Sequence, residues 1–180
     1  VGSDYVFPKS VNEIIKYRIS ELGGQVTGEE YAVLGDTNFI KIVDKIIESK
    51  PDVIINTING DSNTAFFKEL RQRGITPDII PTMSFSISEN EILTIGTDNV
   101  KGDYAAWNYF QSIDSPQNNK FVSNFKKMYG ADRVVSDPLA AGYAGVYIFA
   151  KAVEAAGTDD VNEIQKAVKG ITLSAPEGII

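Results

Sequence analysis

The sequence contains no cysteine and no histidine among its 180 residues. Disulfides, thiolate ligands and imidazole ligands are therefore excluded. Catalysis by a serine–histidine or cysteine–histidine pair within this chain is excluded for the same reason. Asp36, Asp61 and Asp103 are the remaining metal-ligand candidates, but nothing in their spacing requires a metal. We expect neither a metal nor a cofactor.

Long apolar runs and clusters of basic residues are also missing. No apolar run reaches the roughly 18 to 20 residues that span a bilayer. The 17 Lys and Arg residues are scattered among 24 Asp and Glu residues, which gives a net charge of −7. An acidic chain without a basic stripe argues against nucleic acid as a partner and against binding to anionic membranes. We expect no membrane insertion of this segment.

The elements that the sequence does encode alternate along the chain. Apolar residues at helical spacing follow Ser10, which is a candidate N-cap, and the β-branched run DVIINTI is typical of a strand buried on both faces. Alternation at about 25 residues per unit predicts an α/β fold, an open parallel Rossmann-like sheet with helices on both faces. Helices are predicted at residues 10–24, 35–50, 59–74, 87–96, 115–130, 137–157 and 159–170, and strands at residues 25–33, 52–58, 79–85 and 99–110.

Ligands of open α/β sheets bind at the carboxyl ends of the strands. Three loops at such ends combine hydroxyls, amides, carboxylates and aromatic rings, a mixture that suits a small, polar, uncharged molecule. The alternative is structural: Asp61 is a possible helix cap, the serines are possible turn residues, and the rings are possible cover for the sheet edge. The candidate ligand-binding residues are Ser3, Tyr5, Phe7, Asn59, Asp61, Ser84, Ser86 and Glu89.

A family resemblance appears at these same loops. The strings GSDYVFPKSVNEII, PDVIINTINGDSNTAFFKEL, MSFSISENEI and YFQSIDSP occur in order. With them, the chain resembles the urea and short-chain-amide binding proteins of branched-chain-amino-acid-type ABC transporters over essentially its whole length. The resemblance implies an incomplete type I periplasmic binding-protein fold, in which two Rossmann-like lobes enclose a ligand. Residues 1–104 would form lobe 2, residues 105–112 a crossover strand, and residues 113–180 part of the helices of lobe 1.

The resemblance also implies a function. Tyr5 and Phe7 would line the pocket of a protein that captures urea or a short amide and delivers it to an ABC permease. Such a protein would be periplasmic or lipid-anchored at the cell surface. An amide-sensing regulator or a receptor domain of the same fold remains an alternative. An amidase is disfavoured, because no Ser-x-x-Lys arrangement occurs in the candidate loops. A chain with half of the cleft is expected to bind ligand weakly and to self-associate through uncovered apolar helices.

Overall fold

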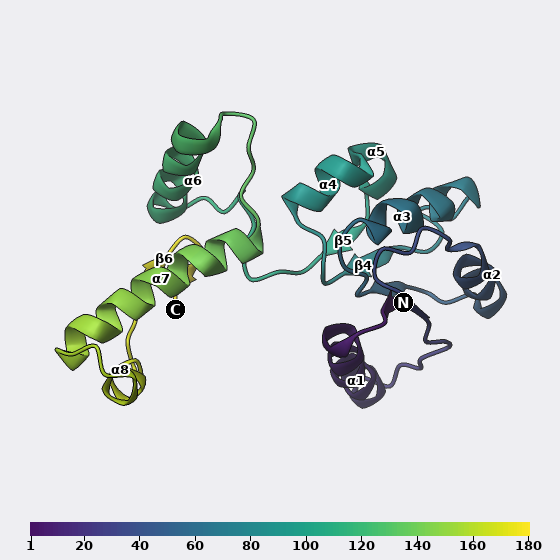
Figure 1. Cartoon of the computed structure of the whole chain (residues 1–180). Coiled ribbons are helices and arrows are strands. Elements are labelled where there is room, and N and C mark those ends of the chain that lie inside the picture. The colour runs from purple at the N-terminus through teal and green to yellow at the C-terminus, as the bar shows by residue number, and fades with distance from the viewer. The chain divides into compact units, whose positions relative to one another are not determined.

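A computed structural model describes residues 1–180. The chain divides into two compact units, Val1–Trp107 and Asn108–Ile180, which are treated one at a time below (Figure 1). No helix combines the length and the apolar character that crossing a membrane requires. The assignment of the two units to lobes of a longer protein stays a prediction.

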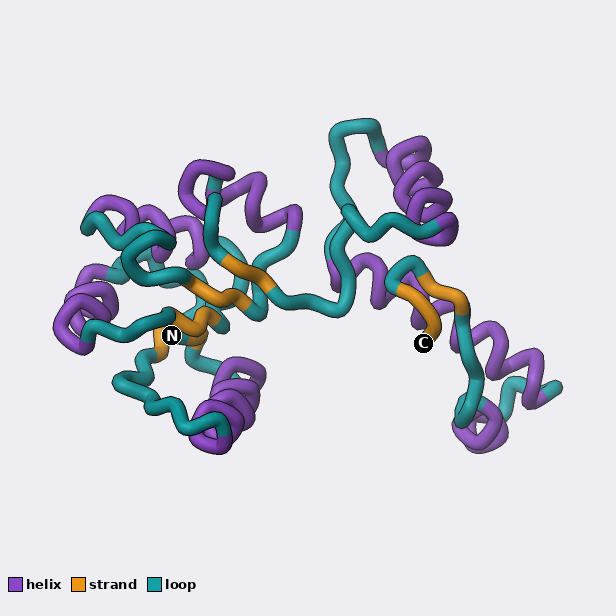
Figure 2. Tube along the Cα trace, turned by 180° about the vertical axis from the view of Figure 1, so that it is seen from behind, coloured by secondary structure: helices purple, strands orange, loops and turns teal.

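The first unit contains a sheet in which every pairing is parallel. One ladder joins β1 to β2 and another joins β3, β4 and β5, while a bridge between Gly2 and Thr57 connects the two. The resulting order β2-β1-β3-β4-β5 reverses direction between β1 and β3, which defines a topological switch point. The predicted open parallel sheet is confirmed. The strands are β1 Gly2–Ser3, β2 Tyr31–Ala32, β3 Ile54–Asn56, β4 Thr82–Ser84 and β5 Tyr104–Ala105 (Figure 2).

Helices cover both faces of this sheet. One face carries α1, Val6–Glu21, and the other carries α2 to α5 (Figure 1). The main apolar core lies under the second group, where the ring of Phe66 packs 5.3 Å from Phe39 and 5.7 Å from Phe67 between centroids. These rings are at most 1% exposed, so they anchor α3 to the sheet. The second group comprises α2 Ile40–Ser49, α3 Ser62–Gln72, α4 Glu89–Ile95 and α5 Thr97–Val100.

Three predicted boundaries are wrong. The first helix begins at Val6, and Tyr5 is its N-cap, so Ser10 lies inside the helix. Pro8 falls in the first turn, where a missing N–H costs no helical hydrogen bond. The strand expected over 25–33 is limited to β2, Tyr31–Ala32, because β1 forms no ladder pair with residues before Tyr31. The strand expected over 99–110 instead consists of the end of α5, β5 and loops.

The second unit is mainly helical around a small core. Tyr109 and Phe121 pack edge to face at 6.2 Å, and Val135 and Ala140 complete the buried cluster. Ser115 caps α6 by accepting a hydrogen bond from the Asn118 N–H at 3.1 Å, as predicted. The elements are α6 Pro116–Tyr129, α7 Asp137–Ala156, α8 Val161–Ala167 and an antiparallel pair, β6 Ser174–Ala175 and β7 Gly178–Ile179.

Candidate functional site

Neutral polar side chains form a buried cluster at the carboxyl edge of the sheet in the first unit. Asn56, at the end of β3, donates from Nδ2 to Asn63 Oδ1 at 2.9 Å and to Ser84 Oγ at 3.1 Å. Its Oδ1 accepts from the Ile58 N–H at 2.9 Å. Asn56 is fully buried, and all of these groups have partners, as buried polar groups require. The cluster ties β3, α3 and β4 together at one point.

The loop after β3 is fixed by the same kind of contact. The Asn59 N–H donates to Ser3 Oγ at 3.0 Å, which links the ends of β1 and β3 at the switch point. The Ile58 carbonyl accepts from Ser86 Oγ and, at 2.7 Å, from Asn63 Nδ2. The backbone of this loop is therefore held in one conformation next to the first turn of α3.

The structure brings four of the predicted residues together in this cluster: Ser3, Asn59, Ser84 and Ser86. The three serines are at most 4% exposed, and their hydroxyls already bond to protein groups. They position the loops, and their role as ligand contacts stays a prediction.

The other four predicted residues lie at the starts of helices. Tyr5 is at the N-cap position of α1 without a side-chain capping hydrogen bond, and Phe7 lies in the first turn, with ring centroids 6.3 Å apart and both side chains half-buried. Asp61 precedes α3 and is exposed, and it makes no side-chain capping hydrogen bond. Asp61 therefore occupies the N-cap position of α3, as the capping interpretation expects, but its exposed carboxylate does not bond to the helix. Glu89 is the first residue of α4 and is half-buried.

Three buried polar atoms near this edge have no hydrogen-bond partner within the protein: Asn59 Oδ1, Ser62 Oγ and Trp107 Nε1. Ser62 opens α3, and Trp107 follows Ala106, whose N–H bonds to the Ser84 carbonyl at 2.9 Å. Buried donors and acceptors are almost always paired, by protein, water or ligand. Asn59 and Ser62 lie on the segment that follows β3 at the switch point, whereas Trp107 lies after β5, and each of these atoms has the capacity for one more polar partner.

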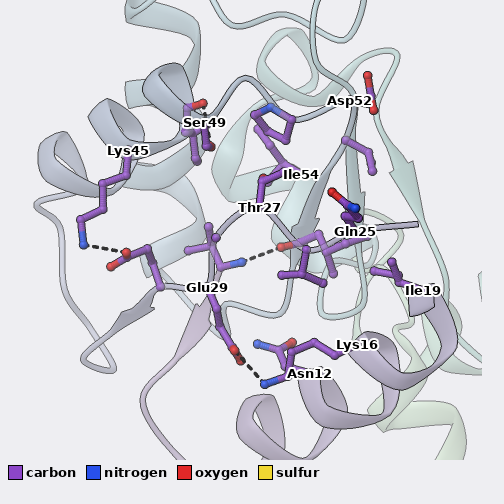
Figure 3. Close-up of a pocket in the computed structure, with 18 of the residues that line it drawn as sticks. Asn12, Lys16, Ile19, Gln25, Thr27, Glu29, Lys45, Ser49, Asp52 and Ile54 are labelled. Carbon is purple, nitrogen blue, oxygen red and sulfur yellow. Dashed lines mark hydrogen bonds and ion pairs between the residues drawn. The ribbon is translucent and has the colours of Figure 1, made fainter. Parts of the chain in front are cut away.

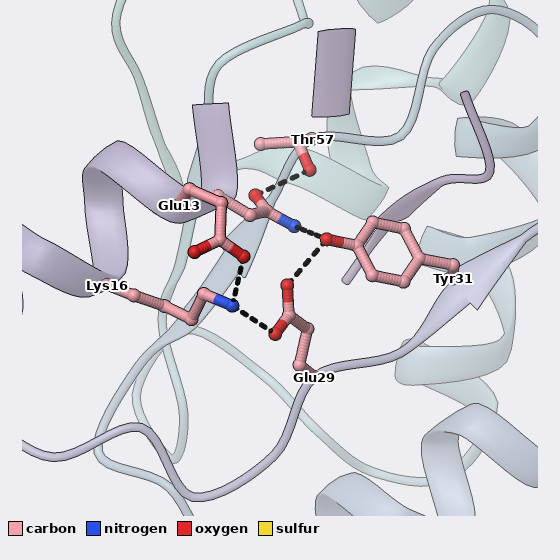
Figure 4. Close-up of polar contacts among 6 residues, drawn as sticks. Glu13, Lys16, Glu29, Tyr31 and Thr57 are labelled. Carbon is pink, nitrogen blue, oxygen red and sulfur yellow. Dashed lines mark hydrogen bonds and ion pairs between the residues drawn. The ribbon is translucent and has the colours of Figure 1, made fainter. Parts of the chain in front are cut away.

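A second polar chain runs from this edge towards α1 (Figure 4). Thr57 Oγ1 donates to Asn12 Oδ1 at 3.1 Å, and Asn12 Nδ2 donates to the Tyr31 hydroxyl at 3.2 Å. Tyr31 donates in turn to Glu29 at 2.5 Å, and Glu29 pairs with Lys16 at 2.8 Å. The hydrogen bond from Lys16, with that from Tyr31, lowers the pKa of Glu29.

A cavity lies at the opposite, amino edge of the sheet. It has a volume of about 490 Å³ and is lined by α1, α2, the start of β3 and the segment 25–30 (Figure 3). None of the eight candidate ligand-binding residues lines it. The structure also contains no group of three or more acidic side chains that could hold a metal ion.

Sequence reasoning missed Asn56, Asn63 and Trp107. Asn56 was detectable as the polar residue that interrupts the apolar run DVIINTI, because a buried polar side chain demands partners. Asn63 and Trp107 were not detectable in this way, because only the folded structure shows which loops they meet.

A parallel sheet with polar groups gathered at its switch point defines an α/β ligand-binding fold. The chain belongs to the periplasmic binding protein domain family, whose model matches residues 1–180. This membership, with the structural matches below, confirms the expected type I periplasmic binding-protein fold.

Known relatives agree with this assignment. The chain is 27% identical over 182 residues to Leu/Ile/Val-binding protein homolog 6 of Brucella suis biovar 1 (strain 1330), covering 99% of this chain and 46% of that protein. It matches an amino acid ABC transporter substrate-binding protein from Pseudomonas fluorescens Pf-5 with TM-score 0.86 and 25% identity, over 99% of this chain and 47% of the other.

A third relative is a solute-binding protein of an ABC transporter from Rhodopseudomonas palustris HaA2, in complex with p-hydroxybenzoic acid. The TM-score is 0.88 and the identity 26%, over 98% of this chain and 49% of the other. This chain therefore spans about half the length of these relatives. They are solute-binding proteins rather than enzymes, which confirms the expectation of a non-enzymatic class.

Proposed function

We propose that this chain is part of the solute-binding component of an ABC transporter, and that the carboxyl edge of its first unit contributes to the solute site. Residues 1–104 then belong to lobe 2, residues 105–112 to a crossover, and residues 113–180 to lobe 1. The observation that carries the proposal is the set of unpaired buried polar atoms on the segments that follow β3 and β5, together with the exposed carboxylate of Asp61 before α3. Periplasmic binding proteins are extracytoplasmic, and a lipid anchor in the parent protein is part of the proposal.

The solute proposed is urea or a short-chain amide. Such a molecule offers N–H donors and one carbonyl acceptor. Asp61 and Asn59 Oδ1 supply acceptors for the N–H groups, and Trp107 Nε1 supplies a donor for the carbonyl. A benzoate, as bound by the Rhodopseudomonas relative, carries a carboxylate that the Asp61 charge would repel. The rings of Tyr5 and Phe7 would form apolar walls.

Transport requires no bond to be made or broken. Solute bound in the cleft favours the closed arrangement of the lobes, because only that arrangement contacts the solute from both sides. The closed protein then delivers the solute to the permease.

A thermal-shift panel on the parent protein tests the solute class. Ligands that bind only the folded state raise Tm. We expect a rise with urea or acetamide, and none with leucine or p-hydroxybenzoate at equal concentration. A rise with leucine or p-hydroxybenzoate alone would reject the amide assignment. On the 180-residue chain by itself, calorimetry should detect no submillimolar binding of urea or acetamide, because half of the site is missing.

We also propose that the isolated chain self-associates through α7. Val146, Tyr147 and Phe149 are each about half or more exposed on this helix, an unusual apolar surface for a protein in water. Sedimentation velocity should show concentration-dependent association that Phe149→Glu weakens. Met128→Glu is the matched control on α6, because Met128 is also an exposed apolar residue. A wild-type chain that stays monomeric at high concentration would contradict this proposal.

A further inference from the structure

The loop between β3 and α3 contains the only asparagine of the chain that is followed by glycine, Asn59-Gly60. The side-chain carbonyl carbon of an asparagine can be attacked by the backbone nitrogen of the next residue. Glycine hinders this attack least, because it has no Cβ. The turn requires glycine here, since Gly60 has a φ of +68°, which other residues rarely adopt. The reactive dipeptide is therefore built into this loop.

Neither of the two reacting groups is held by a hydrogen bond. The Gly60 N–H and the side-chain nitrogen of Asn59 have no hydrogen-bond partner within the protein, and Gly60 is exposed. Asn59 is half-buried, and its Oδ1 is buried without a partner. The neighbouring Asn56 and Asn63 are by contrast fully buried, and their side-chain amides are hydrogen-bonded. Asn59 is therefore the asparagine of this loop whose amide is free to react.

We propose that Asn59 is a site of spontaneous covalent modification by deamidation. The Gly60 nitrogen attacks Cγ of Asn59, and the new C–N bond closes a succinimide ring. The bond between Cγ and Nδ2 breaks, and ammonia leaves with the proton that Gly60 gives up. Water then adds to either ring carbonyl and opens the ring, which yields aspartate or isoaspartate at position 59. Water is the only co-reactant, and no oxidant or reductant is consumed.

The modification changes the charge of the carboxyl edge. Either product adds a carboxylate two positions before the exposed carboxylate of Asp61, in a chain whose net charge is already −7. In the solute site proposed above, a neutral acceptor next to Asp61 would thereby become an anionic one. This consequence rests on the proposed function, whereas the modification itself does not.

The isoaspartate product also changes the backbone, because its peptide bond runs through Cγ and lengthens the chain between Ile58 and Gly60. Asn63 bridges this stretch: its Nδ2 donates to the Ile58 carbonyl at 2.7 Å and to the Gly60 carbonyl at 3.3 Å. The Asn63 N–H also donates to the Gly60 carbonyl, at 3.2 Å. A lengthened chain moves these carbonyls apart, so one side chain no longer reaches both. The isoaspartate form should therefore release the first turn of α3.

Peptide mass spectrometry of the folded parent protein, incubated at pH 8, tests the modification. We expect a mass gain of about 1 Da at Asn59, with isoaspartate among the products. It should form at least about tenfold faster than at Asn90, an exposed asparagine followed by Glu91, which is the internal control. The rate should fall at pH 6, because the Gly60 amide must give up its proton to attack. Conversion of Asn59 no faster than that of Asn90 would overturn the proposal.

Amide hydrogen exchange on the incubated protein tests the release of α3. The Asn63 amide should exchange about tenfold faster or more once Asn59 has been converted. The matched control is Asn59→Gln, which keeps the amide but needs a larger ring to react, so the same incubation should leave its Asn63 amide protected. Unchanged exchange in the converted protein, or equal acceleration in Asn59→Gln, would overturn the release. Neither measurement uses a solute, so failure here is distinguishable from failure of the amide assignment.

Discussion

The two ends of the sheet in the first unit are held together by different forces. At the carboxyl edge, Asn56 and its neighbours join the strands through neutral amides and hydroxyls. At the amino edge, Arg71 bonds to Asp103, and Asp103 also accepts from the Thr82 N–H at 2.8 Å. Neutral hydrogen bonds are directional and independent of pH, so they suit an edge that must present a fixed shape to a solute. The stability contributed by the amino edge should therefore depend on pH, whereas the stability contributed by the carboxyl edge should not.

The largest expected effect is the loss of Arg71. Asp103 is 4% exposed, and Arg71→Met would leave its charge buried without a partner. We expect the free energy of unfolding to fall by about 3 kcal/mol at pH 7, measured by urea denaturation. Burial raises the pKa of Asp103 even beside Arg71, so its protonated form is favoured in the folded state. The loss should therefore shrink as the pH is lowered and Asp103 takes up a proton.

Arg73→Met is the matched control for this change. Arg73 pairs with Asp44 at 2.5 Å, but both side chains are more than one-third exposed. Surface pairs contribute little to stability, so this variant should unfold almost like the wild type. Equal losses in the two variants would show that burial of the Asp103 pair is not what holds the amino edge.

The second-largest effect is expected at the carboxyl edge, for the loss of Asn56. Asn56→Leu removes three hydrogen bonds and leaves the Ile58 N–H without its acceptor. We expect a loss of about 2 kcal/mol in the free energy of unfolding. Because the bonds of Asn56 are all to neutral groups, this loss should be the same at pH 5 and pH 8. A loss that depends strongly on pH would contradict the proposed difference between the two edges. Asn90→Leu, at an exposed site on α4, is the control for the substitution itself.

The smallest effect is expected for Glu29. Its hydrogen bond to Lys16 lowers its pKa below the ordinary value of 4.5. A lowered carboxylate pKa stabilises the fold above the unfolded-state value, and this contribution is lost as the pH falls through the folded-state value. Glu29→Gln should therefore be slightly less stable than the wild type at pH 7, and the two should converge below pH 4.5. Urea midpoints across this range measure the difference, and a gap that widens at low pH would contradict it.

The sequence allowed the architecture to be predicted because the pattern is local. The run DVIINTI is apolar on both faces, as a central parallel strand must be, and β3 lies within it. The length of β2 could not be predicted in the same way. The segment 25–30 has strand-like residues, but a strand exists only where a neighbour supplies hydrogen bonds, and β1 pairs only with Tyr31 and Ala32, which follow that segment.

The candidate site was predictable in position more than in detail. Strand ends rich in Ser, Asn and Asp pointed to the carboxyl edge, where Ser3, Asn59, Ser84 and Ser86 do meet. The sequence could not indicate that the serine hydroxyls bond inward while Asp61 stays exposed. That division depends on which backbone groups the folded loops leave without partners, and such partners are distant in the chain.

The most direct test of the account is calorimetric titration of the parent protein with urea and acetamide, using wild type, Asp61→Ala and Asp98→Ala. Asp98 is an exposed aspartate on α5 and serves as the matched control. We predict that the wild type binds one of the two solutes, that Asp61→Ala weakens its binding by about tenfold or more, and that Asp98→Ala leaves it unchanged. Unaltered affinity in Asp61→Ala, or tighter binding of a carboxylate solute by that variant, would contradict the placement of an amide site at this edge.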